Sequence, residues 1–208
     1  MALTMRGRRI LALSLASLAV VTAVGAAGFV AYPFYTDWQA GRTQTDLRAA
    51  FGSDELKEAY RNRRVGDAQP LTRITIPAMK TDTIVVEGTS AKALNTGAGH
   101  YPNTPLPGEP GNVAIAGHRT TYGKPFANLE ILKPGDKVFL ETPFAKHTYE
   151  VVPAFGGHQN PWVVAANDWS VAEQAPESML TLTTCHPRGS DRQRLVARAK
   201  LVKSEPLA

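Results

Sequence analysis

The chain has 208 residues, a formal net charge of +5 and a single cysteine, which excludes an internal disulfide. Residues 1–69 carry nine Lys and Arg against six Asp and Glu, and residues 70–208 carry fourteen against twelve. The larger part of the chain is thus near neutral and has no clustered basic stripe, which argues against nucleic-acid binding. One Cys and scattered His residues at no ligand spacing argue against a zinc site, and no cofactor is predicted.

The first predicted element is a membrane span. Residues 10–34 form an apolar run without a charge, long enough to cross a hydrocarbon core of roughly 30 Å. Three arginines precede it, and the positive-inside rule places residues 1–9 in the cytoplasm as a basic flank. A cleaved signal peptide is the alternative, because small residues at 24–27 resemble a cleavage site. The apolar run continues beyond that site, so we favour an uncleaved transmembrane helix with the rest of the chain outside.

Residues 35–69 are predicted to form a partly helical extracytoplasmic linker. The segment is polar and charged, and glycines interrupt it. Residues 54–60 are expected to make two helical turns, with Ser53 as the N-cap.

The pattern changes at Pro70, where short strands begin that are separated by Gly and Pro turns. Alternating or β-branched runs predict strands at 72–76, 83–87, 112–116, 137–140, 147–152, 180–185 and 194–202. Residues 92–94 predict one helical turn, and residues 125–132 predict a short helix. Seven or eight short strands with few helices indicate an all-β barrel or sandwich over residues 70–204.

Cys185 lies where one of these strands should end. Residues 180–183 alternate apolar and hydroxyl side chains, and Pro187 and Gly189 then break the pattern. A thiol at a strand's exit is held by a rigid scaffold yet can meet a substrate. The alternative is an inert, buried cysteine. Polar neighbours argue against that alternative, because a buried inert thiol normally has apolar surroundings. These neighbours are Thr184, His186 and Arg188.

Three motifs resemble those of the sortases, the membrane-anchored cysteine transpeptidases of Gram-positive bacteria. Residues 111–120 (GNVAIAGHRT) resemble the sortase histidine strand, residues 180–185 (LTLTTC) its cysteine motif, and residues 193–196 (QRLV) its arginine strand. The resemblance covers roughly residues 70–204. Residues 99–108 (GHYPNTPLPG) and 185–188 (CHPR) are most similar to class E, the housekeeping type of high-GC actinobacteria. The resemblance implies an eight-stranded β-barrel with short helices.

The resemblance also implies three catalytic roles, and the chemistry needs these residue types. Cys185 is the expected nucleophile, since a thiol forms an acyl-enzyme that survives until an amine arrives. His118 is the expected general acid and then base. Arg194 is the expected donor to the substrate carbonyl and oxyanion, because guanidinium stays charged at any relevant pH. Arg192 and Arg198 share its side of the strand, so only the family pattern favours Arg194.

Four further residues are predicted to bind substrate: Tyr101, His100, Thr184 and Arg119. For His100 and Tyr101 the equal alternative is aromatic packing within a proline-rich loop. His186 adjoins the thiol, but adjacent residues of an extended chain point to opposite faces, so it is expected to turn away.

The predicted function is therefore the cleavage of a C-terminal signal resembling Leu-Ala-X-Thr-Gly, or Leu-Pro-X-Thr-Gly, between Thr and Gly. Transfer of the protein to an amine of the peptidoglycan precursor lipid II would follow, at the outer face of the membrane. The partners would be surface proteins that carry the signal. Three alternatives remain: a pilin-polymerising sortase with a pilin amine as acceptor, a thiol hydrolase, and a catalytically silent binding module on a membrane stalk.

Overall fold

A computed structural model describes residues 5–155 and 157–207. The chain divides into two compact units, one ending at Tyr35 and the other beginning at Thr36. Residues 1–4 of the predicted basic flank lie outside the described residues.

One described helix, α1 (Met5–Ala50), is long and apolar enough to cross a membrane, with a mean hydropathy of 2.2 over its most apolar window. The sequence predicted that this helix would end near Phe34, but it continues for 16 residues after that position, to Ala50. The later part is amphipathic in its contacts, because Ala40 and Leu47 are buried while Asp46 is exposed. Tertiary packing thus extends the helix through a segment whose polarity suggested a linker.

The predicted linker residues from Thr36 onward belong to the same compact unit as the strands. Leu47 packs in a small apolar cluster with Ile84, Val86 and Ala93. After a turn comes α2 (Asp54–Arg61), in which the predicted N-cap is confirmed: the Ser53 hydroxyl accepts the N–H of Leu56 at 3.2 Å.

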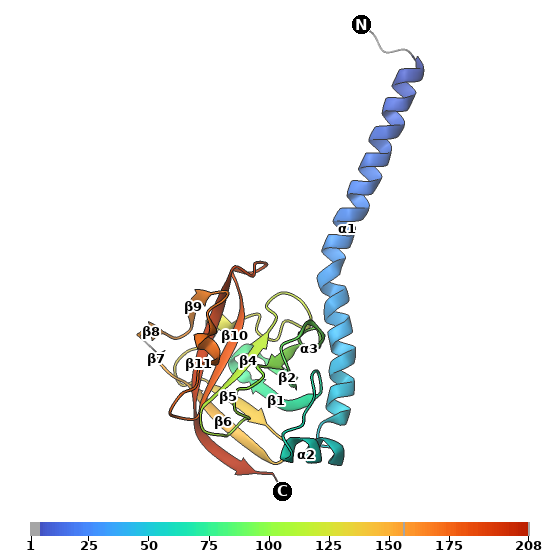
Figure 1. Cartoon of the computed structure of the whole chain (residues 1–208). Helices are drawn as coiled ribbons and strands as arrows, with labels where there is room; N and C mark the ends of the chain where they lie inside the picture. The colour runs from blue at the N-terminus through green and yellow to red at the C-terminus, as the bar shows by residue number, and fades with distance from the viewer. Residues whose placement is uncertain (1–4, 156, 208) are drawn as a thin grey trace. The chain divides into compact units, whose positions relative to one another are not determined.

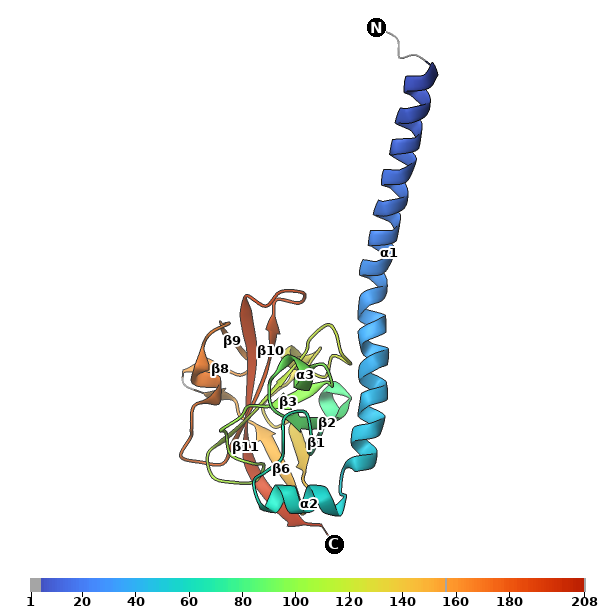
Figure 2. The same cartoon turned by 45° about the vertical axis from the view of Figure 1, so that its right-hand side comes forward.

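Within the described residues, eight strands close into a barrel, which confirms the predicted fold class (Figures 1 and 2). Going round the barrel, the order is β10, β4, β3, β2, β1, β5, β6 and β11, and β11 pairs again with β10. The strands are β1 (Pro70–Ile76), β2 (Thr81–Glu87), β3 (Ala98–His100), β4 (Asn112–Gly117), β5 (Lys137–Glu141), β6 (Ala145–Val151), β10 (Met179–His186) and β11 (Gln193–Pro206).

Smaller elements lie between these strands. A third pairing partner of β11, β9 (Trp162–Ala165), lies against its first residues, and β7 (Ala154–Phe155) and β8 (His158–Gln159) form a separate hairpin. The short helices are α3 (Ala91–Leu94) and three 3₁₀ turns, η1 (Pro77–Met79), η2 (Leu129–Ile131) and η3 (Trp169–Ala172).

The predicted helix over residues 125–132 is wrong, since only η2 is helical there. Its N-cap position, Asn128, makes no side-chain cap bond. The segment is instead held by its contacts: Phe126 N–H donates to the carbonyl of His118 at 3.2 Å, and the Phe126 ring is fully buried. Packing of the apolar residues into the barrel decides the local conformation.

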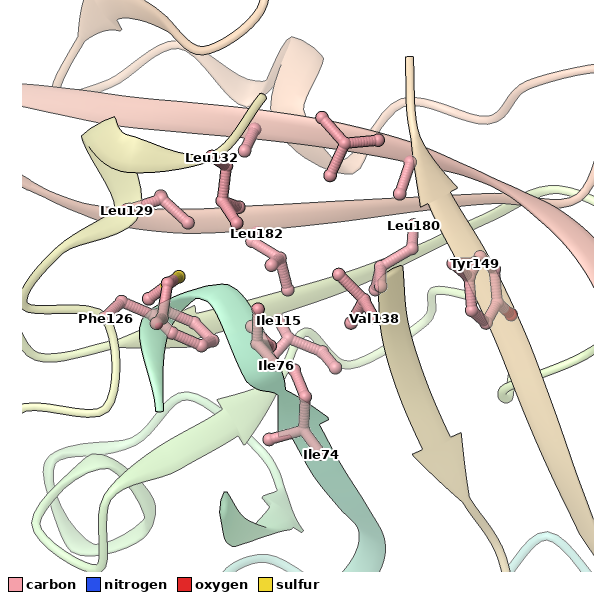
Figure 3. Close-up of a cluster of buried hydrophobic side chains, with 14 of the residues drawn as sticks. Ile74, Ile76, Ile115, Phe126, Leu129, Leu132, Val138, Tyr149, Leu180 and Leu182 are labelled. Carbon is pink, nitrogen blue, oxygen red and sulfur yellow. The ribbon is translucent and has the colours of Figure 1, made fainter. Parts of the chain in front are cut away.

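The barrel interior is filled by large apolar side chains from all sides (Figure 3). Ile74 and Ile76 of β1, Ile115 of β4 and Leu180 and Leu182 of β10 point toward one another there. Their strands alternate or run continuously apolar, as the sequence pattern predicted. This core holds the ends of β4 and β10 in place, and the candidate catalytic residues His118 and Cys185 lie at those ends.

Candidate active site

A cavity of about 340 Å³ opens at the ends of β4, β10 and the start of β11. Five of the seven residues predicted for the site line it. They are Cys185, His118, Arg194, Tyr101 and Thr184. His100 and Arg119 are not among the described residues that line it.

Cys185 and Arg194 form a directly opposed pair on the antiparallel strands β10 and β11. Opposed residues have their Cβ atoms about 5 Å apart on one face of the sheet, so the thiol and the guanidinium stem emerge side by side. Arg194 Nη1 donates to the carbonyls of Asp191 at 2.7 Å and Gln193 at 3.0 Å. Its Nε and Nη2 make no hydrogen bond with the described part of the chain, so they remain available to a substrate oxygen.

The other two candidate arginines, Arg192 and Arg198, do not lie opposite Cys185. Alternation along the strand could not reveal this, because it places all three arginines on the same side. Arg198 pairs with Thr181, four residues deeper along the barrel, and only 3% of it is exposed. Arg192 precedes β11 and donates to the hydroxyl of Ser190. The strand register therefore separates Arg194 from both.

His118 follows the last residue of β4, Gly117. A Cβ at Gly117 would lie 2.7 Å from the Phe126 ring, so only glycine permits this close approach. Burial lowers the pKa of His118 below its usual value, which leaves the resting ring neutral at pH 7. Its Nε2 is buried and has no hydrogen-bond partner among the described residues. The ring lies 5.0 Å from that of Tyr122, tilted by 33°.

Side-chain hydrogen bonds join the histidine and cysteine strands beyond their last backbone pair, Ala116 with Thr183. The Thr184 hydroxyl donates to the carbonyl of Gly117 at 2.7 Å, and Arg119 Nη1 donates to the carbonyl of Cys185 at 3.2 Å. The first bond ties the residue before Cys185 to the strand that leads to His118. The second ties the residue after His118 to the backbone of Cys185. Together they fix the relative position of His118 and Cys185, because both donors are buried.

Arg119 lies behind the cysteine rather than in the cavity, and 6% of it is exposed. It pairs with Glu130 at 3.1 Å, and Arg188 pairs with the other oxygen of the same carboxylate at 2.8 Å. Arg119 Nη1 is also 3.0 Å from His186 Nδ1, which must accept because arginine has only donors. His186 is thus turned to Arg119, outside the lining of the cavity.

Tyr101 lines the cavity, and its hydroxyl is 3.1 Å from that of Thr183. His100 is buried beneath the same loop. Its Nδ1 is 2.7 Å from Glu87 Oε2, and its Nε2 is 3.0 Å from the carbonyl of Pro105. Substrate binding and packing within the loop were the two predictions for these residues. The structure places Tyr101 in the lining of the cavity, and it places His100 among the residues that hold the loop.

The structure adds a wall that the sequence analysis missed, formed by Asp168, Trp169 and Val171 around η3. Trp169 is 73% exposed. The tryptophan in the loop before the Cys185 strand was the available signal. No group of three or more His, Cys, Asp or Glu side chains suited to a metal occurs among the described residues.

A buried polar network holds this wall against the barrel. Asn112 Nδ2 donates to the carbonyls of Val171 at 2.9 Å and Glu173 at 3.0 Å. Arg198 donates to the Thr181 hydroxyl at 2.8 Å and to the carbonyl of Ser170 at 3.1 Å. The conformation of η3, and so one side of the cavity, depends on these core side chains.

A thiol, an imidazole and a guanidinium line one cavity in an eight-stranded barrel, which is the fold and the set of residue types that the resemblance to the sortases implied. The Sortase domain family matches residues 74–202, more than half of the chain, and the chain belongs to the sortase family.

Its relatives include class E enzymes. The chain is 34% identical to sortase SrtE2 of Streptomyces coelicolor over 140 residues, covering 62% of this chain and 55% of that protein. It is 28% identical to SrtE1 of the same organism, covering 86% of this chain and 53% of the relative. The chain thus spans about half the length of these relatives.

Solved structures agree with the fold. Sortase E from Streptomyces avermitilis is 34% identical, with a TM-score of 0.59 over 68% of this chain and 93% of that one. A Clostridium perfringens sortase D5 transpeptidase is 27% identical, with a TM-score of 0.65 over 78% and 98%.

Proposed function

We propose that this chain is a membrane-anchored cysteine transpeptidase that cleaves a C-terminal sorting signal between Thr and Gly and passes the protein to an amine. The signal would resemble Leu-Ala-X-Thr-Gly or Leu-Pro-X-Thr-Gly. The observation that carries the proposal is the direct pairing of Cys185 with Arg194, with His118 lining the same cavity.

The chemistry proceeds in two acyl transfers. The Cys185 thiolate attacks the Thr carbonyl carbon, and the negative charge of the tetrahedral intermediate falls on the carbonyl oxygen. Arg194 stabilises that oxyanion through the N–H groups of Nε and Nη2, which do not donate to main-chain carbonyls of the described chain. The C–N bond to Gly breaks, the Gly amine takes its proton from His118, and a thioester remains on Cys185.

The second transfer reverses the proton movement. An acceptor amine attacks the thioester carbonyl, His118 takes the amine proton, and the thiolate leaves as the new amide forms. Because the pKa of His118 is lowered, the base form predominates at pH 7, which favours this deacylation step. The acid form needed in the first step is then a minority species.

Tyr101 and Thr184 are the proposed substrate contacts, since both line the cavity. Arg119 and His100 are proposed to act one layer behind, by holding Cys185 and the Tyr101 loop. Residues 10–34 of α1 are the proposed anchor, with residues 1–9 cytoplasmic and the domain outside. The proposed partners are signal-bearing surface proteins and an amine of lipid II, or of a pilin, held at the same membrane. Shared anchorage raises the effective concentration of both substrates.

The test uses residues 36–208, which form one compact unit, and two fluorogenic peptides that differ in Ala or Pro at the second signal position. Each is incubated with and without a peptidoglycan stem-peptide amine or a lysine-bearing pilin peptide. Thiol-dependent cleavage with product diverted to an amine adduct is expected, and Cys185→Ala should abolish it. Cleavage to the free acid alone, whichever amine is added, would identify a thiol hydrolase instead. No cleavage of either peptide by the folded unit would overturn the proposal.

A further inference from the structure

We propose that Asp37 and Thr36, which directly follow the apolar run of α1, are positioning residues for His118 and act through the loop of residues 120–124. The inference rests on the proposed function for the role of His118. It means that the segment next to the anchor is part of the catalytic apparatus as well as a tether.

Asp37 binds the loop with both carboxylate oxygens. The backbone N–H of Gly123 donates to Oδ1 at 2.9 Å, and Lys124 Nζ is 2.6 Å from Oδ2. The backbone N–H of Tyr122 donates to the Thr36 hydroxyl at 3.4 Å, a longer and weaker bond. Charge assistance makes the Asp37 bonds the stronger of the two sets, so Asp37 carries most of the effect.

The loop also lies close to the buried side of the helix. A Cβ at Gly123 would lie 3.7 Å from that of Ala40, and Thr36 and Ala40 are each only 1% exposed. These residues lie on the buried side of the helix, one turn apart. The hydrogen bonds thus join the loop to a part of the helix that is shielded from water.

The loop needs this external support. Tyr122, Gly123 and Lys124 have φ values of 51°, 75° and 40°, three left-handed residues in succession. Glycine adopts that conformation freely, but tyrosine and lysine do so at a steric cost. A strained conformation persists only where surrounding contacts over-determine it, and Thr36 and Asp37 supply such contacts to all three residues.

The loop in turn places a ring against the catalytic histidine. The Tyr122 and His118 ring centroids are 5.0 Å apart. His118 Nε2 has no hydrogen-bond partner in the described chain, so packing contributes much of what orients the imidazole. Release of the loop from Asp37 would let Tyr122 move away and admit water to His118.

The charged and titratable groups that face His118 come from other elements. Cys185, Arg194, Asp168 and Tyr101 line its cavity, and Arg119 adjoins it in sequence. Asp37 lines a separate cavity beside α1 and is absent from that lining. Its effect is thus expected to pass through the loop, and a substitution that keeps the hydrogen bonds should keep the effect.

The first test measures kcat and KM of the full chain in detergent with the sorting peptide. Asp37→Ala should lower kcat about tenfold, because the acid–base residue is misplaced, with KM within about twofold. Asp37→Asn retains an acceptor for Gly123 and should recover most of the rate. Asp46→Ala removes an exposed carboxylate from the same helix and should match the parent chain. A kcat for Asp37→Ala equal to that of Asp46→Ala would overturn the inference.

The second test does not need activity, so it decides this inference even if no peptide is cleaved and the proposed function fails. Histidine-selective isotope labelling follows the titration of His118 in the folded full chain. In Asp37→Ala and Tyr122→Ala the pKa of His118 should rise toward its usual value and the ring-current shift should diminish. Asp37→Asn, Tyr122→Phe and Asp46→Ala should leave both nearly unchanged. An unaltered His118 resonance in Asp37→Ala would refute the positioning role.

Discussion

Arg119 Nη1 lies 3.2 Å from the main-chain carbonyl oxygen of Cys185. The residue that follows His118, the candidate acid–base catalyst, therefore binds the backbone of the candidate nucleophile. The bond spans the point where the backbone pairing of β4 and β10 stops. Glu130 pairs with Nη2 of the same guanidinium and compensates the buried charge. The distance between thiol and imidazole is therefore set in part by a side chain that does not line the cavity.

Arg119→Met should consequently lower the acylation rate about tenfold and lower the free energy of unfolding by about 1–3 kcal/mol. The matched control is Arg188→Ala, which removes the other arginine that pairs with the Glu130 carboxylate and leaves the bond to Cys185 intact. Single-turnover acylation and urea unfolding measure the two effects. Equal acylation rates in the two variants would show that the bond to Cys185 does not position the thiol.

The register between β10 and β11 makes a second prediction, about which arginine serves the reaction. Arg194→Ala should reduce kcat/KM about 10²–10³-fold, the usual cost of an oxyanion donor, with the free energy of unfolding almost unchanged. Arg194→Lys should recover little, because an ammonium cannot reproduce the guanidinium fork. Steady-state kinetics with thermal unfolding test this.

Arg192 and Arg198 are the controls for that prediction. Arg192→Ala should be near neutral, because within the described part of the chain its side chain donates a hydrogen bond to Ser190 alone. Arg198→Met should instead lower stability by roughly 3 kcal/mol, since it strips donors from a buried network. If Arg192→Ala lost as much activity as Arg194→Ala, the assignment from register would be wrong.

The residue pattern predicted most of the strands but left a barrel and a sandwich open, and the resemblance to the sortases supplied the eight-stranded barrel and the roles expected of Cys185, His118 and Arg194. The alternation that ends at Cys185 and the apolar run before His118 predicted two strand ends, and the structure brings them to one cavity. Alternation along a strand does not give the pairing register between strands. It therefore could not separate Arg194 from Arg198, and the pairing of β10 with β11 does.

Long-range packing explains the remaining differences. The stretch after Tyr35 was interpreted as a linker because it is polar and charged and glycines interrupt it. Its buried apolar residues, such as Ala40 and Leu47, are few. Residues 125–132 have the spacing of a helix, but only residues 129–131 are helical, because the segment follows the burial of Phe126 in the barrel. Contacts between distant segments decide both cases, and local propensity does not report them.

Two histidines that are shielded from water, the half-buried His118 and the buried His147, predict acid sensitivity. Burial lowers the pKa of both His118 and His147 in the folded chain. Below the ordinary histidine pKa of about 6.5 the unfolded chain then binds more protons, so the free energy of unfolding is highest above that pH and falls as the pH drops through it. A urea-unfolding series from pH 8 to 5.5 should show this loss.

His147→Gln should flatten that series, since it removes one of the two groups whose protonation favours unfolding. His147 is 8% exposed, and its Nδ1 lies 2.9 Å from the Ser204 hydroxyl, a contact that an amide can partly replace. The exposed His158 is the control, and His158→Gln should follow the parent curve. An unchanged slope in His147→Gln would assign the sensitivity elsewhere.

Gln44 tests whether the residues after the apolar run belong to the folded domain. Its Nε2 donates to the carbonyls of Ile84 at 2.9 Å and Thr96 at 3.0 Å, and its Oε1 accepts the Ile84 N–H at 2.8 Å. One side chain thus satisfies three backbone groups, and Ile84 is buried. Without it those groups lose their partners at a cost of about 1–3 kcal/mol.

We therefore expect Gln44→Ala to destabilise residues 36–208 by that amount, while the exposed Gln39→Ala has no effect. A fragment of residues 70–208, which lacks all of α1, should unfold at a lower temperature than residues 36–208. It should lose the contribution of Leu47 to the apolar cluster as well as the three hydrogen bonds. Differential scanning calorimetry compares the four proteins. Equal transition temperatures for the two fragments would mean that the helix after Tyr35 is a tether that contributes nothing to the barrel.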